Sequence, residues 1–366
     1  MSTPQPFRWS HLAQPVLALG LALAALHAQA GVGMTRLMAG DLPVTLVYPS
    51  DAPESRLVQG PFELSVALDG PPAPASAPRR LIVLSHGTGG SATSDHEMAA
   101  TLARAGFIVA QPLHAGDNFQ DIAKAGPVSW ETRPKEISRA IDFLAAHPVW
   151  GTLVQTDRVG VHGMSAGGGT ALVMAGAQWS TLQLARHCLE RADEDLGFCF
   201  SGLPRADKQA ERRAQFERLR GAPDAYLPAE LKAWHGGRSP ADSADPRPDP
   251  RVAAVSVAVP VSAIFSAESL ARITVPVVVL RAARDQWLLP QWHSDHVLRH
   301  CKTCKLLVNL EGAAHMDLVS PWPEATARAV AAQQARGGWP EPGFDPAARA
   351  AAFQAVAAFF AQQLKP

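Results

Sequence analysis

The residues best suited to chemistry lie around Ser165, within the string 163–167, which reads Gly-Met-Ser-Ala-Gly. An apolar run at Val159–His162 precedes this string, and small residues with a helical pattern follow it. A strand, a sharp turn and a helix in this order expose a serine hydroxyl at the tip of the turn. Glycines at 163 and 167 suit such a turn, because strand and helix come too close for side chains. The pattern predicts a nucleophile, although Gly-rich turns without a function share it.

A serine hydroxyl attacks efficiently only when a base takes its proton and a carboxylate orients that base. Behind such a turn the partners follow in the order acid, then histidine, each in a loop after a strand. Asp285 follows the apolar run Val275–Leu280, and His315 follows Leu306–Leu310. We therefore predict Asp285 as the acid and His315 as the base. Two alternatives stay open: Asp285 could only cap the next helix, and Glu311 is a rival acid, although it precedes His315 too closely to face it easily.

Acyl transfer also needs donors for the oxyanion. The loop 86–90 reads His-Gly-Thr-Gly-Gly and follows the apolar run Leu81–Ser85, where such a loop is expected. The predicted donors are the backbone amides of Thr88 and Ala166. The alternative is a flexible glycine loop that does not touch substrate. This chemistry needs no cofactor, and we expect activity to fall in acid, where a histidine base takes up a proton.

The N-terminus resembles an export signal. Arg8 is the only charged residue of 1–30, Val16–Leu26 is uninterruptedly apolar, and Ala28-Gln29-Ala30 fits a cleavage site. Eleven apolar residues are too few to span a bilayer, which takes about 20. We therefore expect a signal peptide at 1–30, no transmembrane segment, and a periplasmic or extracellular protein; a retained amphipathic anchor is the alternative. The 33 basic and 33 acidic residues balance, which disfavours a nucleic-acid partner.

Export favours disulfides over free thiols. The chain has four cysteines, and we expect two pairs, Cys188 with Cys199 and Cys301 with Cys304. A zinc site is a less favoured alternative, because three histidines lie close to the second pair. These histidines are His293, His296 and His300. Tryptophans can line an apolar pocket, although large aromatic residues more often belong to the core. The candidates are Trp130, Trp287 and Trp292.

Alternating strands and helices predict an α/β fold with a mostly parallel, eight-stranded sheet and helices on both faces. The predicted strands are Pro43–Tyr48, Phe62–Leu68, Leu81–Ser85, Phe107–Pro112, Val159–His162, Val252–Val259, Val275–Leu280 and Leu306–Leu310. The predicted helices are Asp95–Ala105, Glu136–Ala146, Thr170–Gln178, Glu324–Arg336 and Ala347–Leu364. The interval of about 179–250 carries no strand pattern but has helical stretches at Asp207–Arg220 and Ala229–Trp234. We predict one domain, 31–366, with this interval as a helical cap insertion; a surface excursion without a role is the alternative.

Several of these segments resemble the α/β-hydrolase superfamily and, more narrowly, the exported proteins called predicted dienelactone hydrolases, which are related to platelet-activating-factor acetylhydrolases. The resemblance rests on Leu42–Pro49, Leu81–Gly90, Leu102–Ala110 and Gly163–Gly168, and it extends from about Asp41 to His315. It implies the α/β-hydrolase fold and hydrolysis of an ester. Dienelactone hydrolases carry cysteine as the nucleophile, so the serine at 165 points to other esters.

The sequence therefore predicts a secreted serine hydrolase that cleaves carboxylic esters through an acyl-enzyme intermediate. Its substrate is expected to be a small-molecule or lipid ester. Alternatives within catalysis are a lipase or phospholipase A2-like lipid esterase, and a polyester or amide hydrolase. A non-catalytic binding protein that retains the fold is the least favoured alternative. The oligomeric state is left open.

Overall fold

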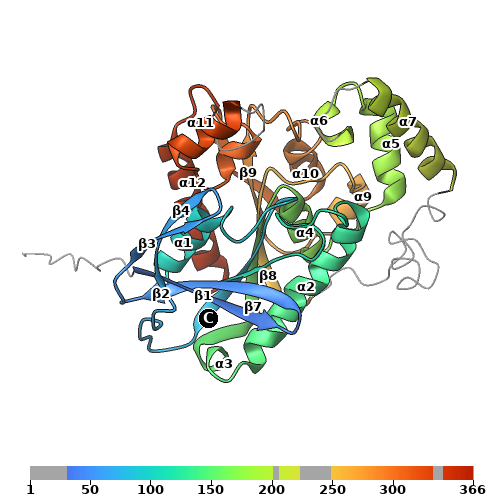
Figure 1. Cartoon of the computed structure of the whole chain (residues 1–366). Coiled ribbons are helices and arrows are strands. Elements are labelled where there is room, and N and C mark those ends of the chain that lie inside the picture. The colour runs from blue at the N-terminus through green and yellow to red at the C-terminus, as the bar shows by residue number, and fades with distance from the viewer. Residues whose placement is uncertain (1–30, 201–205, 223–248, 333–340, 366) are drawn as a thin grey trace, which may run out of the picture.

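The computed structural model describes residues 31–200, 206–222, 249–332 and 341–365. The predicted signal peptide and the predicted helix Ala229–Trp234 lie outside the described residues. Along the described chain, strands and helices alternate around one central sheet (Figure 1). None of the helices in these ranges is long and apolar enough to cross a membrane.

The sheet has ten strands in the order β10-β9-β8-β7-β5-β6-β2-β1-β4-β3. The strands are β1 Gly31–Ala39, β2 Leu42–Ser50, β3 Ser55–Gln59, β4 Phe62–Leu68, β5 Arg79–Ser85, β6 Ile108–Pro112, β7 Val154–Met164, β8 Val252–Ala258, β9 Val277–Ala282 and β10 Cys304–Leu310. Every neighbouring pair from β10 to β6 is parallel, whereas β2 pairs antiparallel with both β6 and β1. The parallel part places the carboxyl ends of β5, β7, β9 and β10 along one edge.

The prediction of eight strands was wrong, because β1 and β3 were missed. β1 forms an antiparallel hairpin with β2, paired from Gly31 opposite Ser50 to Ala39 opposite Leu42. Its residues do not alternate clearly in polarity, and its extended form depends on the hydrogen bonds to β2. β3 is a short edge strand whose side chains are mostly exposed. Such strands carry little hydrophobic signal, because only one neighbour and little burial define them.

Most helices of the described chain form two layers, one on each face of the sheet, and the others lie outside it. The helices are α1 His96–Arg104, α2 Pro127–Ala146, α3 Trp150–Leu153, α4 Ala166–Met174, α5 Thr181–Arg191, α6 Leu196–Cys199, α7 Ala206–Gly221, α9 Ala267–Ala271, α10 Ser294–His300, α11 Glu324–Ala332 and α12 Pro346–Gln363. One buried cluster joins the sheet to α2, α4 and α10, and a second joins it to α1 and α12. Successive residues of β5 alternate between the clusters: Leu81 and Val83 enter the first, Ile82 and Leu84 the second. Burial on both faces explains why such strands read as continuous apolar runs.

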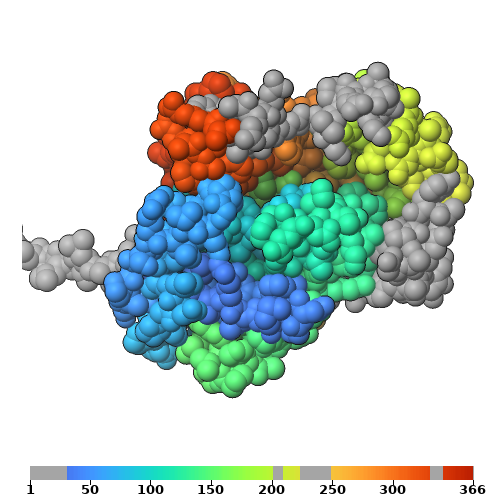
Figure 2. Space-filling model, in the orientation of Figure 1, coloured from blue at the N-terminus to red at the C-terminus, as the bar shows by residue number. Residues whose placement is uncertain are grey.

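The predicted insertion contains α5, α6 and α7, which group outside the sheet at the upper right of Figure 1. These helices share a small buried cluster of their own, which includes Ala185, Phe200 and Phe216. In Figure 2 the molecular surface is hollowed between this yellow-green insertion and the orange C-terminal elements. The insertion therefore stands beside the carboxyl edge of the sheet, where the predicted catalytic residues lie.

Candidate active site

Ser165 lies in a sharp turn between β7 and α4. Its backbone angles, φ 57° and ψ −119°, are unfavourable for a residue with a side chain. A Cβ atom added to Gly163 would lie 2.0 Å from the carbonyl oxygen of Gly167, and one added to Gly167 would lie 1.9 Å from that of Ser85. Only glycine fits both positions. The close approach of strand and helix explains the glycine spacing and lifts the serine hydroxyl out of the turn.

The structure brings the predicted serine, histidine and aspartate together. His315 Nε2 lies 3.0 Å from Ser165 Oγ, and His315 Nδ1 lies 2.7 Å from Asp285 Oδ2. The Asp285 and His315 residues are only 2% and 3% exposed. A carboxylate that accepts from Nδ1–H leaves Nε2 free to accept the serine proton. This geometry suits transfer of the proton from Ser165 to His315.

The acid is held by its own loop. Asp285 Oδ1 accepts hydrogen bonds from the backbone amides of Trp287 and Leu288, each at 2.9 Å, so Asp285 caps this turn as well as facing the histidine. The Trp287 ring stacks on the His315 ring, with centroids 5.5 Å apart and planes 9° from parallel. The rival acid Glu311 instead accepts a hydrogen bond from Asn309 Nδ2. The geometry therefore favours Asp285 over Glu311 as the partner of the histidine.

Thr88 and Ala166, the predicted oxyanion donors, both line the cavity that contains Ser165. Ala166 begins α4, where a backbone amide has no partner within the helix. Among the described residues, neither amide donates to another group. These two amides therefore remain the predicted donors for a negatively charged oxygen.

A buried arginine holds the glycine loop from behind. Arg133 of α2 is 0% exposed, and it donates to the His86 carbonyl oxygen at 2.6 Å and to Asp117 Oδ2 at 2.7 Å. Asp117 Oδ1 in turn accepts the amide of Gly89 at 3.2 Å. Through these hydrogen bonds, Arg133 holds carbonyl groups of the glycine loop toward α2. No local sequence pattern indicated this network, although Arg133 lies four residues before Ile137, on the apolar stripe of α2.

A second serine, histidine and acid also lie in contact. His114 Nε2 lies 2.8 Å from Ser85 Oγ, and His114 Nδ1 lies 2.7 Å from Glu136 Oε2. Ser85 and His114 are 0% exposed and do not line the cavity. Burial, and next the charge of nearby Arg133, hold the pKa of His114 well below its usual range. This buried set links β5 to α2 and lies outside the lining of the cavity that contains Ser165.

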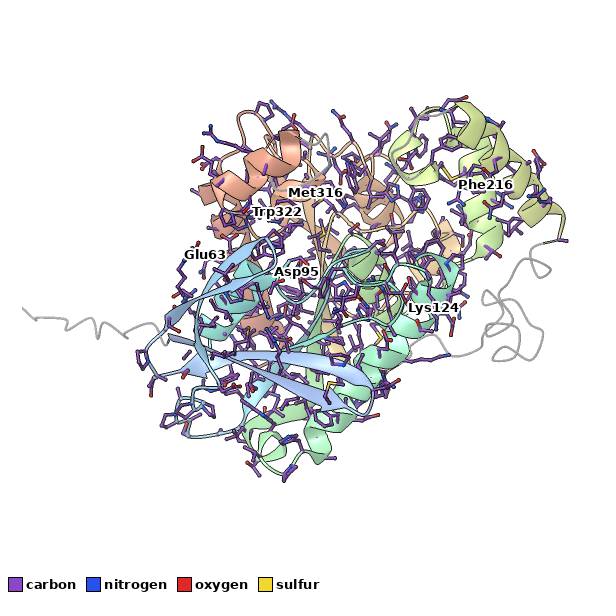
Figure 3. All side chains as sticks on the ribbon, viewed as in Figure 1. Glu63, Asp95, Lys124, Phe216, Met316 and Trp322 are labelled. Atoms are coloured by element: carbon purple, nitrogen blue, oxygen red, sulfur yellow. A yellow bond between two sulfur atoms is a disulfide. The ribbon has the colours of Figure 1, made fainter. Side chains whose placement is uncertain are left out.

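The cavity around Ser165 has a volume of about 950 Å³ and is lined by side chains that are mostly nonpolar. Its aromatic lining residues are Phe62, Phe119, Trp130, Phe198, Phe216, Trp287 and Trp322. In Figure 3, Phe216 of the insertion lies far from Met316 and Trp322, which also line the cavity, so the cavity extends from the insertion to the C-terminal segment. Of the tryptophans considered from the sequence, Trp292 is not part of the lining.

Asp95 also lines this cavity, and it carries an unusual carboxyl group. The residue is 4% exposed, and its Oδ2 atom has no hydrogen-bond partner within the described chain. Burial raises its pKa to about 7, against the opposing influence of Arg133. Figure 3 labels Asp95 below Met316 and Trp322. No sequence motif indicated a role for Asp95.

Both predicted disulfides are present, Cys188–Cys199 and Cys301–Cys304. Two of the three histidines considered for zinc have other hydrogen-bond partners. His293 Nδ1 accepts the Ser262 amide at 3.1 Å, and His296 Nε2 lies 2.9 Å from the Phe265 carbonyl oxygen. Because the thiols of Cys301 and Cys304 are oxidised, they offer no thiolate to a metal.

Comparison with known proteins supports the fold. No protein-family model and no curated protein sequence matches the chain. Among solved structures it is similar to a ferulic acid esterase from Streptomyces cinnamoneus, with 18% sequence identity and a TM-score of 0.50 over 93% of this chain and 92% of that one. Together with the sheet order and the turn at Ser165, this similarity shows that the chain has the α/β-hydrolase fold.

Proposed function

We propose that the protein is a serine hydrolase that cleaves carboxylic esters through an acyl-enzyme intermediate. The observation that carries this proposal is the chain of two contacts, 3.0 Å and 2.7 Å, that joins Ser165 through His315 to the buried Asp285. The strained turn at Ser165 supports the same function, as do the amides of Thr88 and Ala166, which have no partner within the described chain. The fold is shared with a protein described as a ferulic acid esterase, which is consistent with ester hydrolysis.

In the proposed reaction, Ser165 Oγ attacks the ester carbonyl carbon while its proton passes to His315 Nε2. The carbonyl oxygen becomes an oxyanion and accepts hydrogen bonds from the amides of Thr88 and Ala166. The carboxylate of Asp285 stabilises the imidazolium that forms on His315. His315 then returns the proton to the leaving alcohol, which leaves an acyl group on Ser165. A water molecule, deprotonated by His315, hydrolyses this acyl-enzyme and releases the acid.

The size of the cavity favours bulky esters over acetates. At about 950 Å³ it lies at the upper end of the usual range for small-molecule sites, which is roughly 300 to 1,000 Å³. Its aromatic and aliphatic lining favours an ester with large apolar groups. A lipid ester and an aromatic ester both satisfy this requirement, and an apolar polyester chain is a third candidate.

We also propose that the protein works outside the cytoplasm, after removal of residues 1–30. Two disulfides support this location, because such bonds persist mainly in oxidising compartments.

Incubation of the purified protein with a fluorophosphonate tests the catalytic proposal. Labelling should reach one per chain and map to Ser165, and Ser165→Ala should abolish it, whereas the exposed control Ser55→Ala should label normally.

A series of p-nitrophenyl esters from acetate to palmitate then tests the substrate class. Ser165→Ala should lose about 10⁶-fold in turnover, as removal of a triad serine does elsewhere. A wild type that neither labels nor hydrolyses any ester of the series would reject the esterase and favour a binding protein. An optimum at acetate would contradict the preference for bulky groups.

A further inference from the structure

The short helix α6 of the insertion lies directly on the loop that carries Asp285. A Cβ atom added to Gly197, in the middle of α6, would lie 2.5 Å from the carbonyl oxygens of both Gln286 and Trp287. No side chain fits there unless one backbone moves. The insertion therefore does more than cover the cavity, because it touches the backbone that follows the proposed catalytic acid.

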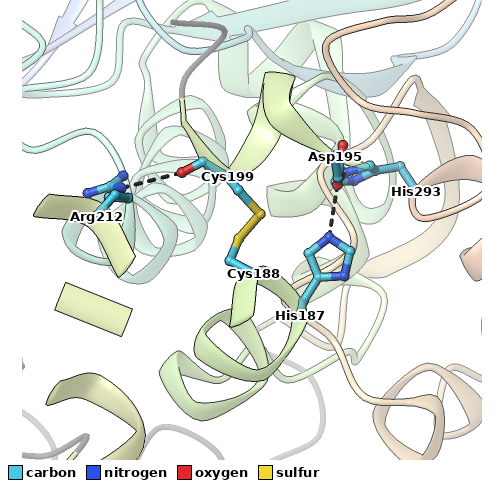
Figure 4. Close-up of a disulfide and its surroundings, with 6 residues drawn as sticks. All are labelled: His187, Cys188, Asp195, Cys199, Arg212 and His293. Atoms are coloured by element: carbon cyan, nitrogen blue, oxygen red, sulfur yellow. Dashed lines mark hydrogen bonds and ion pairs between the residues drawn. A yellow bond between two sulfur atoms is a disulfide. The ribbon is translucent and has the colours of Figure 1, made fainter. Parts of the chain in front are cut away.

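A buried carboxylate fixes the start of α6 to the core of the domain. Asp195 is 0% exposed, and its Oδ2 atom lies 2.8 Å from His187 Nε2 and 3.1 Å from His293 Nε2 (Figure 4). His187 belongs to α5, whereas His293 immediately precedes α10. Burial by itself would raise the pKa of Asp195, but the hydrogen bonds from the two histidines outweigh it and lower that pKa. Asp195 thus joins the insertion to the core.

The tautomer of His293 follows from its other partner. Its Nδ1 atom accepts the backbone amide of Ser262 at 3.1 Å, so the ring proton lies on Nε2 and is donated to Asp195. Ser262 Oγ also donates to the His293 carbonyl oxygen at 2.8 Å. The preceding residue, Val261, donates its amide to the Ser165 carbonyl oxygen at 2.9 Å. Hydrogen bonds therefore connect Asp195 to the segment that supports the serine turn.

The other end of α6 is also fixed. Cys199 forms the disulfide with Cys188 of α5, and its carbonyl oxygen accepts a hydrogen bond from Arg212 of α7 (Figure 4). The disulfide and Arg212 hold α6 to the rest of the insertion, whereas Asp195 holds its first turn to His293 of the core, next to the loop beneath Gly197. That loop supplies the Trp287 and Leu288 amides that hold Asp285 Oδ1.

We propose that Gly197 and Asp195 are positioning residues for the catalytic acid: α6, anchored by Asp195, presses on 286–287 and so keeps Asp285 and Trp287 in place against His315. This inference rests on the proposed serine-hydrolase function. It assigns the insertion a part in catalysis itself, besides the shaping of the cavity. The insertion should then affect turnover even of a small ester that does not reach it.

Gly197→Ala is the direct test, with p-nitrophenyl acetate as substrate and active sites counted by fluorophosphonate titration. The added methyl group displaces the loop, so kcat per active site should fall about 10- to 100-fold, as expected for a displacement of about 1 Å near reacting groups. KM should change little. The acid limb of the pH profile should move to lower pH, because a displaced carboxylate stabilises the protonated histidine less. The matched control is Gly221→Ala at the end of α7, where an added Cβ meets nothing within 4 Å.

A second pair of variants covers the possibility that Gly197→Ala folds poorly. Asp195→Ala removes the shared acceptor and should lower kcat per active site, whereas Asp195→Asn keeps an acceptor oxygen and should recover much of it. Asp193→Asn is the control, because Asp193 is exposed and pairs with Arg213 on the surface. Unchanged kcat and an unchanged pH profile per active site in Gly197→Ala and Asp195→Ala would overturn the inference. Failure of the wild type itself to label at Ser165 would instead overturn the proposed function.

Discussion

Replacing Arg133 by methionine is expected to lower the free energy of unfolding by about 3–5 kcal/mol, because it leaves a buried charge without its partner. Arg133 and Asp117 are both 0% exposed, and their side chains meet at 2.7 Å. The guanidinium also donates to the His86 carbonyl oxygen at 2.6 Å, a bond that methionine cannot replace. A loss of this size is a large fraction of the roughly 5–15 kcal/mol that stabilises a typical domain.

A double-mutant cycle isolates the pair. Asp117→Asn removes the charge of the carboxylate but keeps an oxygen for the Gly89 amide, and by itself it should also destabilise, because Arg133 is then unpaired. Arg133→Met combined with Asp117→Asn should cost less than the sum of the single changes by about 1–3 kcal/mol. Urea unfolding followed by tryptophan fluorescence measures all four proteins. A loss below about 1 kcal/mol in Arg133→Met, or strict additivity, would refute this account of the network.

The same variant should also affect turnover. Arg133 holds the His86 carbonyl group of the loop that contains Thr88, a residue that lines the cavity, so its loss should displace one of the two proposed oxyanion donors. Complete removal of one donor costs about 10²- to 10³-fold in kcat, and this sets the upper limit for Arg133→Met. Activity is to be compared per fluorophosphonate-labelled site, which separates misplacement of the loop from loss of folded protein. An unchanged kcat per site would show that the loop keeps its geometry without Arg133.

Three further outcomes are expected. Asp285→Asn should lower kcat by about 10⁴-fold, whereas Glu311→Gln should leave kcat nearly unchanged. Equal losses of kcat in the two variants would contradict the assignment of Asp285 as the acid of the triad. Replacing both Cys188 and Cys199 by serine should cost roughly 3 kcal/mol in thermal or urea unfolding, the chain-entropy value for their separation of 11 residues, and a loss below about 1 kcal/mol would contradict that value. Burial raises the pKa of Asp95 from 3.8 to about 7, so the wild type loses folding free energy as the pH rises between these values. Relative to wild type, Asp95→Asn should therefore gain stability from pH 4 to pH 8, by up to about 4 kcal/mol. A stability difference that does not change with pH would refute the raised pKa.

The residues expected to do the chemistry could be predicted because each follows a strand with a strong local signal. These strands are β7, β9 and β10, and their carboxyl ends lie on one edge of the sheet. They contain most or all of the apolar runs Val159–His162, Val275–Leu280 and Leu306–Leu310. Parallel strands bring such ends together whatever the intervening loops do. The positions of Ser165 and His315 in the fold therefore followed from the order of these runs.

The missed features depend on partners far away in the chain. β1 is extended because β2 pairs with it, and Arg133 is buried because Asp117 and the loop at His86 surround its charge. Asp195 lies 98 residues from His293, and no local pattern relates the two.

Hydrophobic periodicity and turn residues are local properties, so the sequence by itself determined the order of the main strands and the residue types at their ends. The pairing of buried charges and the contact of α6 with the loop after Asp285 arise only when the chain is packed, because desolvation makes most buried polar groups pair with partners that are close in space. Only the tertiary structure decided that the insertion touches the backbone beside the proposed catalytic acid.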